Sequence, residues 1–186
     1  MLMDRIIKVL TFRREVYAEV ERDTEFTNTA WLLVVVVSLL AQIGKFSSFG
    51  FGAFGKWLIA AIVGTILAVL GFAVGCMVIS AVGKALFRAE VSFEEMVRTL
   101  GLAYVWNIIG VFGILAAVAP ALACVLTPVI IIAAIVGLVS WLFAAKEALD
   151  LDWGPTAITL IIGWIVTFVI TLIASPILGL LGLTAA

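Results

Sequence analysis

The chain has 186 residues and a formal net charge of −1; apolar residues make up 65% of it and charged residues 12%. Soluble domains usually contain about 45–50% apolar and about 25% charged residues. So few polar side chains cannot cover a folded chain in water. The composition therefore excludes an ordinary soluble domain and predicts that lipid is the main solvent.

The residue inventory also excludes several classes of function. Nucleic-acid binding needs a basic surface, so no nucleic-acid partner is expected at this charge. The chain contains no histidine, the commonest metal ligand and a common general base. Cys76 and Cys124 lie inside apolar runs, where we expect small hydrophobic side chains rather than a disulfide or a metal site. We predict a protein that is not an enzyme and that uses no metal or cofactor.

The first part of the chain, residues 1–27, predicts a cytoplasmic amphipathic segment. Apolar residues recur at helical spacing, but Arg13 falls toward the apolar face, so we expect a break near Thr11. Acidic and basic residues are mixed, which makes the segment a poor electrostatic lipid binder. We expect it to lie flat on the membrane or to pack beneath the bundle.

Five apolar segments are long enough to cross a bilayer, whose hydrocarbon core of about 30 Å needs about 20 helical residues. They are residues 28–46, 57–83, 99–119, 121–145 and 156–183. Pro120 separates the third from the fourth, because it lacks an amide donor and disfavours helix at the residue before it. The predicted fold class is an all-α integral membrane protein, with a five-helix transmembrane domain over residues 28–186.

The positive charges are divided unequally between the two ends of these spans. Nine lie in the N-terminal segment and in the second and fourth loops, whereas the first loop carries only Lys45 and Lys56. Loops rich in Lys and Arg stay on the cytoplasmic side. We therefore expect a cytoplasmic N-terminus and a C-terminus outside.

A charged helix start interrupts the apolar chain at residues 90–107, EVSFEEMVRTLGLAYVWN. Ser92 and Glu95 have the spacing of a capping box, in which each side chain binds the backbone amide of the other residue. Glu94 and Arg98 have the spacing of a favourable helical ion pair. We expect an amphipathic turn at the cytoplasmic interface that continues into the third span.

Small and polar residues predict where helices touch. Gly64, Gly71 and Gly75 follow one another at helical spacing in the second span, and the last two form a G-x-x-x-G sequence that lets another helix approach closely. That helix could belong to the same chain or to a second copy. Asn107, well inside the third span, is predicted to form a hydrogen bond to another helix, a substrate contact being the alternative.

The amphipathic N-terminal segment, the five spans and the central sequence SFEEMVRTLGLAY (92–104) resemble the Ypt-interacting (Yip) family of membrane proteins. The later sequence WLFAAKEALDLDWGPTA (141–157) is similar to the fourth-span exit and short cytoplasmic loop of the family's prokaryotic members. The resemblance covers nearly the whole chain and implies the same topology, in a prokaryotic cell membrane. Eukaryotic relatives have a long polar N-terminal region and are implicated in vesicle traffic through Rab-type GTPases. The short N-terminal segment predicts that such a GTPase is not a partner here.

The leading hypothesis is a non-enzymatic membrane protein that acts through contacts with lipids, with other membrane proteins or with a second copy of itself. Two groups of residues, one from the central segment and one from the fourth loop, are predicted to form the cytoplasmic face that a partner meets. They are Phe93, Glu94, Arg98, Gly101 and Tyr104, with Asp150, Asp152, Trp153, Gly154 and Pro155.

The alternative is a passive channel or a lipid-translocating protein. Uncharged polar side chains can line such a path, and the candidates are Asn107, Ser140, Thr167 and Thr171. The four longest spans contain no ionisable acidic or basic residue, although driven transport usually requires one.

Overall fold

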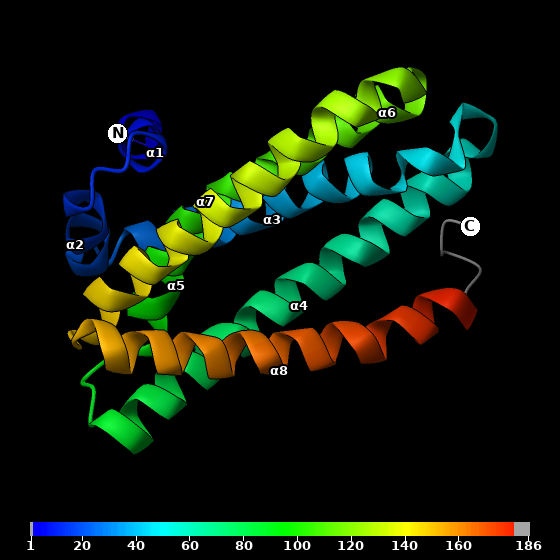
Figure 1. Cartoon of the computed structure of the whole chain (residues 1–186). Helices are drawn as coiled ribbons and strands as arrows, with labels where there is room; N and C mark the ends of the chain where they lie inside the picture. The colour runs from blue at the N-terminus through cyan, green and yellow to red at the C-terminus, as the bar shows by residue number, and fades with distance from the viewer. Residues whose placement is uncertain (1, 181–186) are drawn as a thin grey trace.

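The computed structural model describes residues 2–180, in which every regular element is a helix. In chain order these are α1 (Leu2–Leu10), α2 (Glu15–Arg22), α3 (Phe26–Lys45), the 3₁₀ helices η1 (Phe46–Phe49) and η2 (Phe51–Ala53), α4 (Phe54–Phe87), α5 (Phe93–Ala103), the 3₁₀ helix η3 (Tyr104–Phe112), α6 (Gly113–Val118), the 3₁₀ helix η4 (Pro120–Leu122), α7 (Ala123–Leu149) and α8 (Trp153–Leu180). The long helices run lengthwise across the molecule, with α1 and α2 at one end (Figure 1). The predicted all-α class is confirmed.

Five helical segments are long and apolar enough to cross a membrane. They are Phe26–Phe49, Phe54–Phe87, Phe93–Val118, Ala123–Leu149 and Trp153–Ile170. Each overlaps one of the predicted spans, so the prediction of five is confirmed.

The third span is not one continuous α-helix. The chain passes from α5 into the 3₁₀ helix η3 and resumes α-helical geometry only in α6. A 3₁₀ helix is tighter than an α-helix, which allows η3 to lie close along α3. Ala119 then leaves helical geometry with φ −135° and ψ 89°. This is the residue before Pro120, where the sequence predicted the end of the third span.

Small residues let α3 lie directly against the third span. Three facing pairs form this contact, the α3–third-span seam: Ala30 with Gly101, Ala41 with Gly110, and Gly44 with Gly113. A Cβ atom added to Gly113 would lie 2.6 Å from the carbonyl oxygen of Gly44. Backbone therefore meets backbone at this end of the seam, and neither position has room for a side chain.

The three glycines predicted to mediate packing of α4 face different surroundings. An added Cβ at Gly64 would lie 2.9 Å from the ring of Phe46, and one at Gly75 would lie 3.3 Å from the hydroxyl oxygen of Thr167. Both glycines thus face neighbours within the same chain. An added Cβ at Gly71 would meet no heavy atom within 4 Å.

The short helices α1 and α2 lie against one end of the bundle. Val16 and Val20 on α2 are fully buried and belong to the same hydrophobic cluster as Met96 on α5 and Leu149 on α7. The chain breaks between α1 and α2, close to the position predicted at Thr11. The N-terminal segment therefore shares its core with the membrane-spanning helices.

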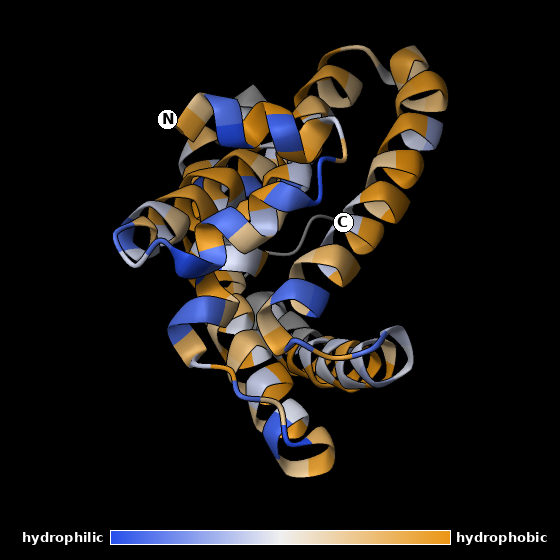
Figure 2. Ribbon diagram, turned by 90° about the vertical axis from the view of Figure 1, so that its left-hand side faces the viewer, coloured by the Kyte–Doolittle hydropathy of each residue, from blue (hydrophilic) through white to orange (hydrophobic). Residues whose placement is uncertain are grey.

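The long helices present apolar side chains on their outer surface. On α7, for example, Ile131, Ile132 and Ile135 are each more than half exposed. Figure 2 shows hydrophobic residues along the long helices and hydrophilic residues mainly at the end that carries α1 and α2. Such a surface suits hydrocarbon, where helices satisfy their own backbone hydrogen bonds.

We expect Gly113→Ala to lower the free energy of unfolding by about 1–3 kcal/mol, the usual effect of overpacking a close contact. The added methyl group would meet the backbone of Gly44, which cannot rotate away. Gly71→Ala is the matched control, since it adds the same atom to open space in a membrane-spanning helix. It should be neutral or stabilising, by up to about 1 kcal/mol. Unfolding by sodium dodecyl sulfate, followed by circular dichroism, measures both variants, and equal losses would contradict the seam.

Candidate functional site

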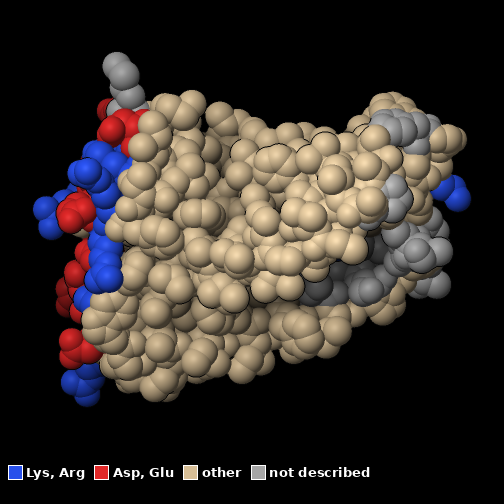
Figure 3. Space-filling view, turned by 45° about the horizontal axis from the view of Figure 1, so that its top comes forward, with Lys and Arg blue, Asp and Glu red and all other residues tan. Residues whose placement is uncertain are grey.

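Charged side chains gather at one end of the molecule. Figure 3 shows Lys, Arg, Asp and Glu concentrated over this end, with a long uncharged surface beyond it. Helices α1 and α2 lie here, together with the start of α5 and the turn between α7 and α8 (Figure 1). The end of α3, with Lys45, and the start of α4, with Lys56, lie at the opposite end. The charged end is therefore the candidate functional site.

Helix α5 begins at this end with the capping box that the sequence predicted. The Ser92 amide donates to Glu95 Oε2 at 2.6 Å, and the Glu95 amide donates to Ser92 Oγ at 3.1 Å. Val91 and Met96, on either side of the cap, are both buried. The cap therefore holds the start of α5 at a defined position, with Glu94 exposed on its outer face.

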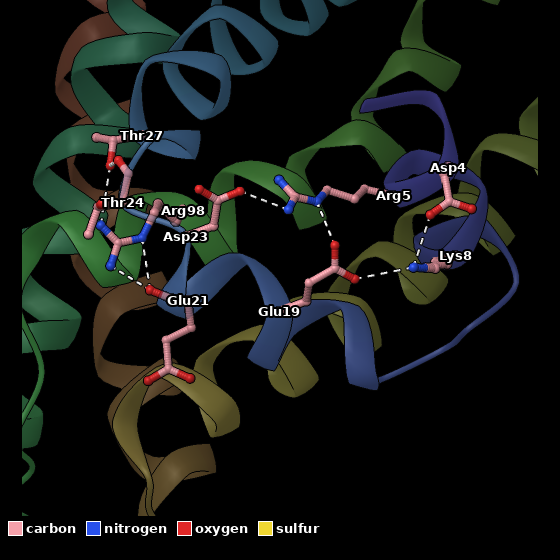
Figure 4. A network of polar contacts seen from close by, with 9 residues as sticks. All are labelled: Asp4, Arg5, Lys8, Glu19, Glu21, Asp23, Thr24, Thr27 and Arg98. Carbon is pink, nitrogen blue, oxygen red and sulfur yellow. Dashed lines mark hydrogen bonds and ion pairs between the residues drawn. The ribbon is translucent and has the colours of Figure 1, made fainter. Parts of the chain in front are cut away.

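Arg98 is only 5% exposed and binds the chain's own backbone (Figure 4). Its Nε and Nη2 both donate to the carbonyl oxygen of Glu21, the former at 3.0 Å, and its Nη1 donates to the Thr27 hydroxyl at 3.2 Å. Glu21 lies in the last turn of α2, where carbonyl groups lack helical partners and carry the negative end of the helix dipole. Arg98 thus ties α5 to the end of α2 and the start of α3. The predicted ion pair between Glu94 and Arg98 is not formed.

A network of ion pairs joins α1 to α2 (Figure 4). Arg5 contacts Glu19 at 3.0 Å and Asp23 at 2.8 Å, while Lys8 contacts Asp4 at 2.9 Å and Glu19 at 3.2 Å. Hydrogen bonds from Arg5 and Lys8 lower the pKa of Glu19, and the hydrogen bond from Arg5 lowers that of Asp23. Exposed pairs of this kind contribute about 0–1 kcal/mol each, so the network holds α1 weakly.

Carboxylates from three elements approach one another near Glu21. Burial is the main cause that raises the pKa of the Glu21 carboxyl, and the negative charges of Asp150, Glu95 and Glu147 raise it further. These residues come from α2, α5 and the end of α7, so the turn after α7 lies close to α2. Among residues 2–180 no group of three such side chains is arranged to hold a metal ion.

Two hydroxyl pairs join helices that are distant in sequence. Tyr17 on α2 and Ser140 on α7 share a buried hydrogen bond of 2.5 Å. Burial raises the pKa of Tyr17 to about 12. Deeper in the bundle, Ser38 on α3 donates to the Tyr104 hydroxyl at 3.2 Å. These bonds connect α2 to α7 and α3 to the third span.

The turn between α7 and α8 carries an exposed aromatic ring with two cations beside it. Trp153 is 44% exposed, and its ring centroid lies 5.7 Å from that of Phe143. The Arg14 guanidinium lies 4.1 Å from the centroid of Phe143 and 5.8 Å from that of Trp153. The Lys146 ammonium lies 5.2 Å from the Trp153 centroid. Asp150 ends α7 in the left-handed conformation, with φ 49°, and directs the chain into this turn.

The residues predicted to meet a partner divide by exposure. Those exposed are Glu94, Asp150, Asp152, Trp153 and Gly154, and those half-buried are Phe93, Tyr104 and Pro155.

Three of the ten, Arg98, Gly101 and Tyr104, make contacts in the interior of the protein. Arg98 binds α2, as described above. Gly101 is buried against Ala30 in the seam, and the Tyr104 ring packs edge-on against Phe72 at 5.4 Å. The physical reason is that α5 is enclosed by other helices, with most of its residues buried. Helix α2 covers it on one side and α3 on the other.

Asn107 does not form the predicted hydrogen bond to another helix. It is exposed, and its Nδ2 donates to the carbonyl oxygen of Tyr104 at 3.1 Å, within its own segment. The geometry of η3 turns this side chain outward, away from α3.

Three of the four polar residues proposed to line a path, Asn107, Ser140 and Thr167, form hydrogen bonds elsewhere. Ser140 binds Tyr17 at the charged end, and Thr167 donates to the carbonyl oxygen of Gly163 at 2.9 Å. Thr171 has a side chain outside the described residues. The channel alternative therefore gains no support from a shared polar lining.

The sequence did not indicate the partners of Arg14, Tyr17 and Ser140. Each contact joins residues more than 120 positions apart, and no local spacing encodes such a pair. The α3–third-span seam did leave a signal, because Gly44, Gly110 and Gly113 are small residues in apolar runs. They do not form a G-x-x-x-G pair within one helix, which is why they were missed.

The Yip1 domain family matches residues 7–175. The chain belongs to that family. The matched range extends from α1 through all five spans, which confirms the resemblance seen in the sequence. Searches of curated proteins and of solved structures gave no significant match to this Yip1-domain protein.

In this Yip1-domain protein we expect Arg98→Met to loosen the end of α2. The substitution leaves the Glu21 carbonyl without its charged donor, and hydrogen bonds to a charged group contribute about 1.5–3 kcal/mol. Amide hydrogen exchange of residues 15–27, followed by mass spectrometry, should therefore speed up by about tenfold or more. Glu94→Gln is the control, because Glu94 does not touch Arg98. Faster exchange in the control would restore the predicted Glu94–Arg98 pair.

Lowering the pH should release α1 from α2. The pKa values of Glu19 and Asp23 are lowered in the folded protein, so their stabilising effect is present above their ordinary values of about 4 and is lost as the pH falls through the lowered ones. The ¹³C-methyl NMR signal of Met3, exposed on α1, should shift below about pH 4. The signal of buried Met96 on α5 is the internal control and should not shift together with that of Met3. The pKa of Glu21, which lies near α5, is raised, so protonation of Glu21 relieves repulsion there instead of breaking a stabilising contact. Simultaneous change of both signals would contradict local release.

Proposed function

We propose that this Yip1-domain protein is a non-enzymatic membrane protein that binds another membrane protein, or a second copy of itself, through its charged end. The observation that carries the proposal is an exposed set of side chains that the fold leaves unpaired. The carboxylates of Glu94, Asp150 and Asp152 are exposed and form no ion pair within the described residues. Exposed Trp153 lies beside Asp152.

The chemistry of this set suits a protein partner. Tryptophan is enriched among the residues that contribute most to binding at protein interfaces, and such residues are commonly surrounded by a polar rim. The acidic residues would guide a basic surface toward it. Both loops are held in place, the first by the capping box of α5 and the second by the left-handed turn at Asp150. A partner would therefore meet a preformed surface.

The positive-inside rule predicts which side of the membrane the charged end faces. Nine of the eleven Lys and Arg residues belong to this end, so it would face the cytoplasm, with the N-terminus inside and the C-terminus outside. The similarity of residues 141–157 to the fourth loop of prokaryotic members supports a place in a prokaryotic cell membrane. A Rab-type GTPase is accordingly not the partner that we propose.

We expect charge reversal of the exposed acidic set to abolish partner binding. The test variant is Glu94→Lys with Asp152→Lys, and the control is Glu15→Lys with Glu25→Lys, which makes the same change in charge at exposed positions of the same end. Each protein is released gently from its own membrane, and co-purifying proteins are identified by native mass spectrometry. A partner should remain with the native protein and the control and be lost from the test variant. Retention by all three proteins would overturn the proposal.

Liposome flux separates this function from the channel or lipid-translocating alternative. The purified protein should release no ions and move no labelled lipid above the background of empty liposomes. Flux that depends on the protein would favour the alternative.

A further inference from the structure

The two cations beside Trp153 form a second, chemically different surface at the charged end. Arg14 comes from the turn between α1 and α2, and Lys146 comes from the last turn of α7. Both lie over aromatic rings, and neither forms an ion pair with a carboxylate among the described residues. We infer that Arg14, Lys146 and Trp153 bind the phosphate of an anionic phospholipid.

The ring contacts leave the donors of both cations available. A guanidinium that stacks on a ring keeps its N–H groups in its own plane, where they can bind a phosphate through two parallel hydrogen bonds. At 4.1 Å from the Phe143 centroid, Arg14 is close enough to be held by that ring. Lys146 adds a compact positive charge 5.2 Å from the Trp153 centroid. The rings thus position two charges without neutralising them.

The depth of the site matches that of a lipid headgroup. Lys146 lies at the end of one membrane-spanning helix, and Trp153 begins the next. Tryptophan prefers this boundary between hydrocarbon and water, and cations there reach toward the phosphate layer.

An apolar surface continues from the cations into the membrane. Phe12, two residues before Arg14, is 45% exposed, and its ring centroid lies 5.8 Å from that of Trp106 in the third span. The turn that carries Arg14 therefore lies against the lipid-facing side of the bundle. A phosphate held by Arg14 would have apolar rings beneath it for an acyl chain, which a free phosphate ion could not use.

Acidic residues are also present at this end, and they limit the affinity. Glu147 and Asp150 both raise the pKa of Glu21 on α2, so their charges act on that helix as well as on the two cations. Asp152 is exposed next to Trp153, and Glu15 follows Arg14. The site consequently depends on short-range contact with the two cations, because the net charge of the whole end is too small to attract lipid by itself.

This inference goes beyond the proposed function and does not require it. The partner surface is tested at Glu94 and Asp152, whereas the lipid site is tested at Arg14 and Lys146. Trp153 is common to both surfaces, so only the substitutions of charged residues distinguish loss of partner binding from loss of lipid binding.

The test uses the full-length protein, freed of lipid in a neutral maltoside detergent and titrated with phosphatidylglycerol, phosphatidylcholine or inorganic phosphate. Native mass spectrometry counts the bound lipid. We expect phosphatidylglycerol to bind in preference to phosphatidylcholine. Arg14→Gln with Lys146→Gln should weaken its binding by about 30-fold, as expected for two cations near a lipid surface.

Lys84→Gln with Arg88→Gln is the matched control, since it removes two exposed, unpaired cations from the same end. Its affinity for phosphatidylglycerol should stay within about threefold of the native value. Trp153→Leu keeps both charges but removes their platform, and it should weaken binding about fivefold, in line with the loss of cation–π contacts. Circular dichroism confirms that each variant is folded. If the Arg14 and Lys146 double variant does not fold, the affinity of Trp153→Leu for phosphatidylglycerol tests the inference instead, and an unchanged affinity would overturn it.

Several results would overturn the inference. Equal losses in the two double variants would show that any cation at this end serves equally. Equal binding of the two lipids would show that the headgroup is not recognised. Displacement of the lipid by millimolar inorganic phosphate would show a site for a free anion rather than for a phospholipid.

Discussion

The close approach of α3 to the third span is the contact on which the other helices depend. In a membrane, lipid tails are as apolar as helix surfaces, so helices associate through close packing of small residues rather than by excluding water. At Gly44 and Gly113 the two backbones touch, and the 3₁₀ segment η3 lies along α3 between this point and the pair of Ala30 and Gly101. The seam therefore places α5 inside the protein, and α2 covers its free side.

The burial of α5 decides which charges remain available. Arg98 loses contact with water but gains the free carbonyl of Glu21 at the end of α2, so a positive charge inside the protein is balanced by a helix terminus instead of an acid. Glu94, on the outer side of the same helix, is left exposed. The charged end thus separates into an acidic surface and, beside Trp153, a pair of cations held by rings.

Local features of the fold could be predicted from the sequence because their causes are local. The capping box needs only Ser92 and Glu95 at the right spacing, and the end of the third span needs only Pro120. The limits of the spans follow from runs of apolar residues. Prediction failed for the partners of Arg98, which are more than 70 residues away in the chain. It also failed for Asn107, whose outward orientation follows from the irregular third span rather than from its spacing.

By itself, then, the sequence determined the solvent of this protein, its five apolar spans, the unequal distribution of charge and its family. Each depends on composition or on spacing within a few residues. Only the tertiary structure decided that Gly101 faces α3 and that Arg98 binds α2. It alone also showed that Arg14 contacts Phe143 and Trp153, which lie more than 120 positions away in the sequence. The reason is that packing in lipid depends on which small residues face each other across helices, and a single helix cannot specify its neighbour.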